Sequence, residues 1–155
     1  MHLASAARWD GTYRYNGTGT IFPGLDAHGI EDPFVYLQPT PWDESRPTFH
    51  AIFHDHSTIG GHAFSSDGVS WTYSPVVPFN ATVQYDDGGR VTFERRERPH
   101  LVFDQRGFPS HLTSGVQPPP TASRVPPSDA FRNDYTYTLV VPLPPQPHEP
   151  PEHPE

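Results

Sequence analysis

Two stretches of the chain each place a carboxylate close before a proline. Asp32 immediately precedes Pro33, and Glu97 stands two positions before Pro99. A pair of carboxyl groups can divide the hydrolysis of a glycosidic bond, because one protonates the leaving oxygen and the other activates water or attacks the sugar. The acid needs a raised pKa, which a neighbouring carboxylate supplies by like-charge repulsion. Asp32 and Glu97 are therefore candidates for such a pair.

Arginines surround Glu97 in the segment FERRERPHLVFD, residues 93–104. In a regular strand Arg95 shares a face with Glu97, where it would hold either Asp32 or a substrate hydroxyl; the sequence leaves that choice open. The opposite face of the same strand would carry three basic side chains: Arg96, Arg98 and His100. A solvated edge strand with an ion-pair cluster explains the same residues without any function. Because Pro99 has no backbone N–H, we expect the strand to be irregular there.

Histidines form a second candidate site. Four of them fall within thirteen residues: His50, His54, His56 and His62. The spacing of His54 and His56 is that of metal ligands in cupin barrels, with His62 as a third ligand. A cupin also requires a glutamate shortly after His56, and none is present. The alternative is that these imidazoles make ordinary hydrogen bonds within strands and turns.

Composition narrows the class of protein. A chain of 155 residues suggests one domain, and the absence of cysteine excludes disulfides and thiolate metal sites. A net charge of −8 argues against nucleic acid as a partner, and no apolar run is long enough for a membrane span. The N-terminal segment lacks the pattern of a signal peptide. Two N-glycosylation sequons nevertheless point towards secretion, Asn16-Gly17-Thr18 and Asn80-Ala81-Thr82.

The chain reads as all-β. It has 21 prolines, 12 glycines and many aromatic residues, and no window shows the 3.6-residue period of a helix. We expect a hairpin region over 8–22, a strand pair that brackets a turn at 86–89 and has 90–96 as its second strand, and further strands at 34–38, 48–55, 62–65, 69–74, 101–104, 110–113 and 134–141. Within 48–55, odd-numbered apolar residues should face one side and His50, Ile52 and His54 the other. Residues 1–141 would form the domain, and the proline-rich residues 142–155 a disordered tail.

Short strands at intervals of about 8–12 residues fit a sandwich, a barrel or a propeller. The turn Ser66-Asp67-Gly68, with Trp71 three residues after the glycine, is typical of propeller blades. In such blades the aspartate caps the hairpin and the tryptophan packs between blades. By itself this turn indicates a propeller only weakly.

Four motifs in succession resemble the five-bladed β-propeller glycoside hydrolases of families 43, 62, 32 and 68, most nearly family 43. They are GIEDPF at 29–34, FHAIFH at 49–54, GGHAFSSDGVSW at 60–71 and RRERPH at 95–100. The resemblance covers about residues 8–141. It implies a partial five-bladed β-propeller built of four-stranded antiparallel blades.

The resemblance also implies roles for individual residues. Asp32 takes the place of the aspartate that tunes the acid and stabilises the transition state, and Glu97 that of the general acid, which is followed in the family by Pro or Gly-Pro. Hydrolysis would proceed with inversion on arabinose- or xylose-containing polysaccharides. Substrate-binding roles are expected for four residues: His54, His62, Arg95 and His100. No cofactor would be required, and a structural Ca²⁺ ion at the centre is compatible with the family.

The chain departs from the family pattern in one respect. The third carboxylate of the family, the general base, has no counterpart, because Asp10 and Asp26 precede Asp32 too closely. At this length there is room for roughly three blades, so we expect the C-terminal part of a propeller with crippled hydrolysis. Its open blade edges would favour self-association.

Three hypotheses remain open from the sequence. The chain is a glycosidase or a fragment of one, a non-catalytic carbohydrate-binding propeller fragment, or a metal-binding histidine cluster on a barrel. Aromatic side chains could stack on sugar rings in either of the first two cases, although most should pack in the core. The candidates are Trp9, Trp42, Trp71, Phe34 and Tyr36.

Overall fold

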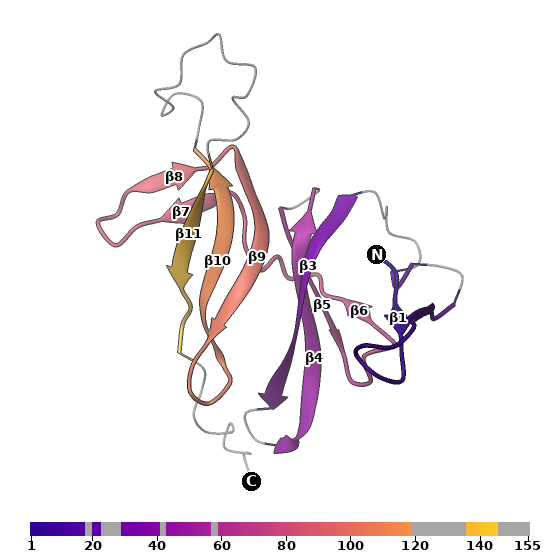
Figure 1. Cartoon of the computed structure of the whole chain (residues 1–155). Coiled ribbons are helices and arrows are strands. Elements are labelled where there is room, and N and C mark those ends of the chain that lie inside the picture. The colour runs from indigo at the N-terminus through magenta and orange to yellow at the C-terminus, as the bar shows by residue number, and fades with distance from the viewer. Residues whose placement is uncertain (18–19, 23–28, 41–42, 57–58, 119–135, 146–155) are drawn as a thin grey trace.

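The computed structural model describes residues 1–17, 20–22, 29–40, 43–56, 59–118 and 136–145. The secondary-structure elements in these segments are all β-strands (Figure 1). The strands form antiparallel sheets, and all of these sheets are open. The all-β prediction is therefore confirmed. None of the described segments contains a helix long and apolar enough to cross a membrane.

The largest sheet has four strands that follow one another in chain order. They are β3 (Ile30–Thr40), β4 (Asp43–Asp55), β5 (Ile59–Ser65) and β6 (Thr72–Tyr73). The first two are longer than the sequence predicted. The strand expected over 69–74 is reduced to two residues, because the turn that precedes it takes up the rest.

A second sheet of three strands stands beside the first. It contains β9 (Arg95–Phe103), β10 (Pro109–Gln117) and β11 (Tyr137–Pro142), with β10 in the middle. The strand expected over 90–96 is interrupted at residues 93 and 94, whose backbone N–H groups donate outside the ladder, to Ala81 O and Gln117 O. Two ribbons complete the fold: β1 (Ala4–Ser5) with β2 (Arg14–Tyr15), and β7 (Thr82–Gln84) with β8 (Arg90–Thr92).

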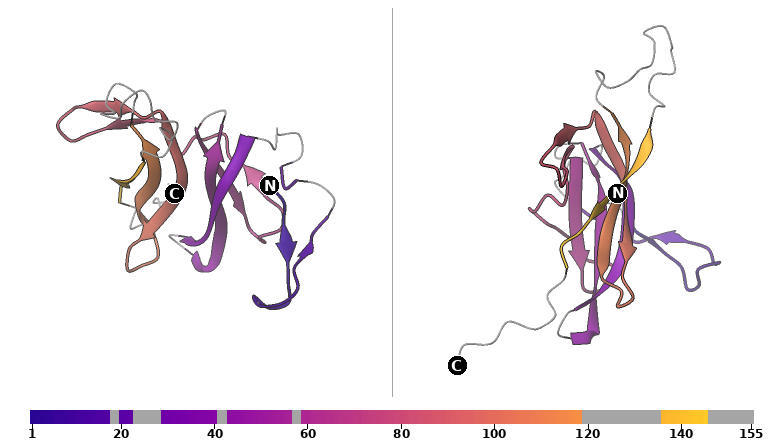
Figure 2. Two further views of the ribbon diagram at one scale, coloured as in Figure 1. Left: turned by 45° about the horizontal axis from the view of Figure 1, so that its top comes forward. Right: turned by 90° about the vertical axis from the view of Figure 1, so that its left-hand side faces the viewer.

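Three apolar clusters hold successive layers together, and Figure 2 shows the two larger sheets side by side with β7 and β8 beyond β9–β11. On one face of the β3–β6 sheet, Ala51 and Phe53 pack with Phe22 of the N-terminal segment. On its other face, Ile52 packs with Leu112 of β10. The third cluster joins β7–β8 to the β9–β11 sheet: Val83, Phe93, Val116 and Leu139. The alternation predicted for residues 48–55 is thus confirmed.

Two glycines allow β5 to lie close to its neighbours. A Cβ atom on Gly61 would lie 2.0 Å from the ring of Phe53, its partner across the ladder, and one on Gly60 would lie 2.5 Å from the carbonyl oxygen of Phe79. Real Cβ atoms do not approach other atoms so closely, so any larger residue would force the strands apart. The absence of a side chain here is a packing requirement.

The turn after β5 forms as its sequence predicts. Asp67 Oδ1 accepts hydrogen bonds from the backbone N–H groups of Ser70, at 2.7 Å, and Val69, at 2.8 Å. These bonds lower the pKa of Asp67 to about 2. Trp71 donates from Nε1 to the Gly68 carbonyl and packs against the cluster around Phe53.

The proline-rich regions lie largely outside the described residues. Neither residues 119–135 nor 146–155, which include most of the expected tail, are described. Residues just after 141 do pack: Pro142 ends β11, and the Leu143 backbone N–H donates to Ser110 O at 2.8 Å. Leu143 also contacts the apolar cluster around Ile52.

Candidate functional site

Two strands are distorted at the residue that precedes a proline. Asp32 in β3 has φ of 52° and Arg98 in β9 has φ of 54°, both in the left-handed region that non-glycine residues rarely adopt. The β3–β4 register shifts between Glu31 and Phe34, and the β9–β10 register shifts between Thr113 and Gly115. Each position is therefore a β-bulge, which re-aims the neighbouring side chains. The irregularity predicted near Pro99 is confirmed.

The two bulges meet. Arg98 Nε lies 4.0 Å from Asp32 Oδ2, and β9 lies against β3. The sequence left open whether Arg95 holds Asp32 or a substrate hydroxyl, and the structure places Arg95 Nε 3.9 Å from Glu97 Oε1. The bulge explains why Arg98 rather than Arg95 lies beside Asp32, because it breaks the alternation of β9 and leaves Arg96 buried and Arg98 exposed. The structure thus links the Asp32 segment to the strand that carries Glu97.

A polar groove runs beside these residues. It consists of two adjoining pockets, about 360 Å³ and 340 Å³, that share Arg98, Gly115 and Thr136. Their size is near the lower end of the roughly 300–1,000 Å³ of small-molecule sites. We define the polar groove by its lining residues: Arg95, Glu97, Arg98 and His100 of β9, residues 113–117 of β10, and residues 136–138 at the start of β11.

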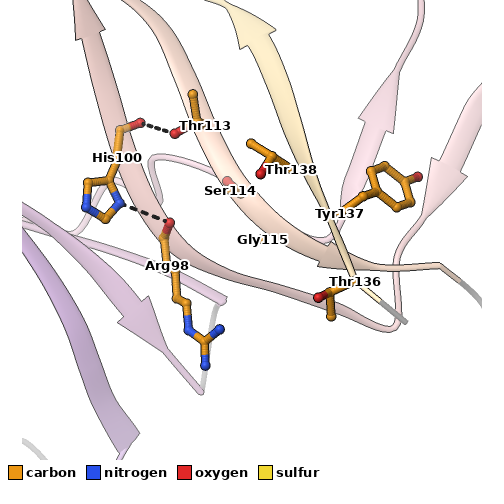
Figure 3. A pocket seen from close by; sticks show the side chains of 8 residues that line it. All are labelled: Arg98, His100, Thr113, Ser114, Gly115, Thr136, Tyr137 and Thr138. Atoms are coloured by element: carbon orange, nitrogen blue, oxygen red, sulfur yellow. Dashed lines mark hydrogen bonds between the residues drawn. The ribbon is translucent and has the colours of Figure 1, made fainter. Parts of the chain in front are cut away.

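Hydroxyl, imidazole and guanidinium groups line the polar groove (Figure 3). Thr113 donates from Oγ1 to the His100 carbonyl at 3.3 Å, and His100 Nδ1 lies 3.4 Å from the Arg98 carbonyl. The His100 ring also packs against Phe34, with centroids 4.8 Å apart. Donors and acceptors of this kind, fixed on adjacent strands, suit a ligand rich in hydroxyl groups.

Glu97 and Asp32 differ in their surroundings. The Glu97 side chain is 23% exposed and lines the polar groove, where it is the only carboxylate that the described part of the chain contributes. The Asp32 side chain is 36% exposed and is reached from the groove through Arg98. Glu97 is therefore placed to contact a molecule bound in the groove, and Asp32 lies beside Arg98, whose guanidinium borders the groove.

Arg96 is buried and does not line the polar groove. Its Nη1 donates to the Asn80 carbonyl at 2.9 Å, and its guanidinium lies 5.1 Å from the centroid of the Phe79 ring. Nε donates to Ser114 Oγ at 3.4 Å. Burial lowers the pKa of Arg96. These contacts tie β9 to the segment before β7, so Arg96 has a structural role.

His54 lies outside the polar groove. Its Nδ1 is 3.3 Å from Glu31 Oε1, and His56 Nε2 is 3.1 Å from the same oxygen. Hydrogen bonding to His54, followed by the contact with His56, lowers the pKa of Glu31. Sequence reasoning used Glu31 only as the neighbour of Asp32 and missed this cluster. The antiparallel pairing of Glu31 with His54 is what joins them.

His62 also lies elsewhere, in the interior between the two larger sheets. It lines an apolar pocket of about 230 Å³ with Leu101 and Leu112, and its Nε2 is 2.9 Å from His50 Nδ1. The two rings stack with centroids 5.2 Å apart, and Tyr36 stacks on the other face of His50. Burial, and then the charge of His62, lowers the pKa of His50 to about 4, and burial also lowers the pKa of His62.

The aromatic residues that sequence reasoning proposed as sugar contacts are mostly placed elsewhere. Trp71, Phe34 and Tyr36 pack against the apolar clusters, Trp9 is 85% exposed outside the groove, and Trp42 lies outside the described residues. Tyr137, which sequence reasoning missed, lines the polar groove and is 49% exposed. Its signal was the alternation of Thr and Tyr at the start of the last predicted strand.

Comparisons with known proteins add no relative. No protein-family model, curated protein or solved structure matches the chain.

Proposed function

We propose that the polar groove binds carbohydrate and belongs to a glycosidase-like site on a partial β-propeller. Glu97 acts as the general acid, and Asp32 stabilises positive charge on the sugar in the transition state. The substrates are polysaccharides that contain arabinose or xylose, with inversion at the anomeric carbon. The observation that carries the proposal is the approach of Arg98 to Asp32, which brings two motifs from distant parts of the chain to one place.

The sheet arrangement supports the propeller part of this proposal. The β3–β6 sheet is a four-stranded antiparallel meander, as a propeller blade is. The β9–β11 sheet packs face to face with it, and the first strand of each sheet, β3 and β9, lie against each other. Successive blades place their innermost strands next to one another in this way.

Arg98 supports the assignment of Glu97. In the resembled family the general acid is followed by Pro or by Gly-Pro, and here Arg98 stands between Glu97 and Pro99. The φ of Arg98 is 54°, a conformation that glycine adopts without strain. The backbone at Arg98 thus has the shape for which a glycine at this point would be suited. Strained residues of this kind cluster at functional sites.

The chemistry that these residues can perform is incomplete. Glu97 would give its proton to the glycosidic oxygen as the bond to the anomeric carbon breaks, while water attacks that carbon from the opposite face. The attacking water must lose a proton to a base. Among the residues that the structure describes, Glu97 is the only carboxylate that lines the groove, and Asp32 lies beside Arg98. We therefore expect binding of the sugar with very weak hydrolysis or none.

Activity and binding should be measured on the same protein. We expect xylo- or arabino-oligosaccharides to shift backbone NMR signals of β9 and of residues 136–138, with turnover far below the roughly 1–1,000 per second of ordinary enzymes. Glu97→Gln should weaken any residual cleavage of sugar leaving groups by about 10²–10⁴-fold, and that of aryl glycosides, which need little acid assistance, by much less.

Glu94→Gln is the matched control, because Glu94 is exposed on the same segment and does not line the groove. It should change neither binding nor cleavage. Binding without turnover would leave the chain as a carbohydrate-binding propeller fragment, the alternative within this proposal. Absence of both binding and cleavage would refute the proposal, and equal losses on both leaving groups for Glu97→Gln would make Glu97 a structural member of the arginine cluster.

A further inference from the structure

A compact group of metal-ligating side chains lies at the start of the β3–β4 pair, outside the polar groove. Glu31, His54 and His56 each offer one ligand atom, and these three atoms lie within 4.8 Å of one another. Glu31 and His54 face each other directly across the antiparallel ladder, and His56 follows two residues later. We propose that these three residues form a binding site for a divalent transition metal ion of the Zn²⁺ type.

The distances fit the coordination geometry of such an ion. A tetrahedral ion with ligands at about 2.0–2.1 Å separates its donor atoms by about 3.3 Å. Both histidine nitrogens approach the same atom, Glu31 Oε1, at 3.3 Å for His54 Nδ1 and 3.1 Å for His56 Nε2. An ion placed among the three atoms, which all lie within 4.8 Å of one another, would take the place of these hydrogen bonds.

The backbone holds the three positions before any ion binds. The His56 backbone N–H donates to the Gly29 carbonyl at 2.8 Å, which closes the end of the ladder next to Glu31. His54 is buried, with 6% of its surface exposed, so its ring has a fixed orientation. The side chains of Glu31 and His56 are each 53% exposed, so an ion can enter from solvent.

The donor set selects the kind of metal. Two imidazole nitrogens and one carboxylate oxygen suit Zn²⁺ and its neighbours, whereas Ca²⁺ requires about six to eight oxygen ligands. The site is therefore distinct from the structural Ca²⁺ that the family resemblance allowed. Three protein ligands also leave a coordination position for water. The ligand set differs from the cupin-like one that spacing suggested, because Glu31 replaces His62, which pairs with His50.

The test is titration of the chelator-treated full chain with Zn²⁺ by calorimetry near neutral pH. We expect saturable binding of one ion and a melting temperature that rises with Zn²⁺ concentration. Glu31→Gln and His56→Gln should each weaken binding at least as much as the loss of an outer-shell partner does, about 10–100-fold. Both side chains are exposed, so these variants should fold.

His2→Gln is the matched control, because it removes an exposed histidine that belongs neither to this group nor to the polar groove. Zn²⁺ binding that survives in this variant and is lost in Glu31→Gln and His56→Gln supports the site. Co²⁺ bound to the same site should show the visible spectrum of a tetrahedral ion. Zn²⁺ binding that is absent, that is unaffected by Glu31→Gln and His56→Gln, or that is matched by Ca²⁺ would overturn the proposal. None of these outcomes depends on the polar groove.

Discussion

Two histidines on the same strand have opposite environments. His50 and His54 lie on one face of β4, four residues apart, and each has a histidine and one other polar side chain as neighbours. His50 pairs across the ladder with Tyr36 and contacts His62, and His54 pairs with Glu31 and contacts His56. The first group contains no carboxylate and lies between two sheets, whereas the second contains one and reaches solvent.

The surroundings of the two groups shift the pKa values of different side chains, His50 in the first group and Glu31 in the second. Around His50, burial opposes protonation and the pKa falls to about 4. Around His54, the histidines lower the pKa of Glu31, so they favour the ionised carboxylate. The first group is thus suited to a neutral, stacked interior, and the second to holding a cation.

The two groups should also respond to pH in different windows. His50, whose pKa is lowered, stays neutral in the folded state while the unfolded chain becomes protonated below about 6.5. Glu31, whose pKa is also lowered, contributes stability that is present above its unfolded value of 4.5 and is lost as pH falls through its folded value. As the pH falls, the free energy of unfolding should therefore decrease first because of the interior pair, His50 and His62.

The largest effect should come from breaking the contact of β5 with β4, on which the pairing of His50 with His62 depends. In Gly61→Ala, the new Cβ would meet the Phe53 ring at 2.0 Å, so the strands must move apart. Overpacking of this kind costs about 1–3 kcal/mol of unfolding free energy. Urea denaturation measures the loss. Gly115→Ala is the control, because its Cβ would meet only an ordinary contact at 3.7 Å; equal losses in both variants would show that β5 does not pack as described.

A smaller effect should isolate the interior pair. Because the folded state binds fewer protons at His50 than the unfolded state does, unfolding free energy should fall as pH is lowered from about 6.5 to about 4. A shift of this size is worth about 3 kcal/mol for a fully enclosed group. The half-buried ring should contribute less, on the order of 1 kcal/mol.

His50→Phe keeps a ring between Tyr36 and His62 and removes the titrating group. The decline in unfolding free energy between pH 6.5 and 4 should become shallower in this variant. His2→Phe, which removes an exposed histidine, should leave the pH profile of the wild-type chain unchanged. An unaltered profile in His50→Phe would mean that the interior pair does not resist protonation.

The smallest effect concerns the β-bulge at Arg98, whose guanidinium approaches Asp32, the residue that follows Glu31. Arg98 holds a left-handed φ that costs an L-residue about 1–2 kcal/mol, and its exposed contact with Asp32 is worth about 0–1 kcal/mol. Arg98→Gly should therefore be at least as stable as wild type, and more stable than Arg98→Gln by about 1 kcal/mol. Urea denaturation of the two variants measures this difference. If Arg98→Gly proves the less stable of the two, the bulge at this position is not left-handed.

The sequence by itself determined the local elements of this protein. Prolines, glycines and alternating aromatic residues predicted an all-β chain, and the faces of residues 48–55 follow from their period of two. The Asp67 turn forms from its own side-chain hydrogen bonds, and Pro99 predicted an irregular β9. Each of these features depends on contacts within a few residues, so local composition is sufficient to predict it.

Only the tertiary structure decided which side chains meet. The bulge at Arg98 turned that arginine, rather than Arg95, towards Asp32, and the register of β3 against β4 placed Glu31 rather than His62 beside His54 and His56. A shift of one residue in register moves every side chain of a strand to the other face. The sequence indicates where most of the strands lie but does not show their register, and the composition of each site depends on that register.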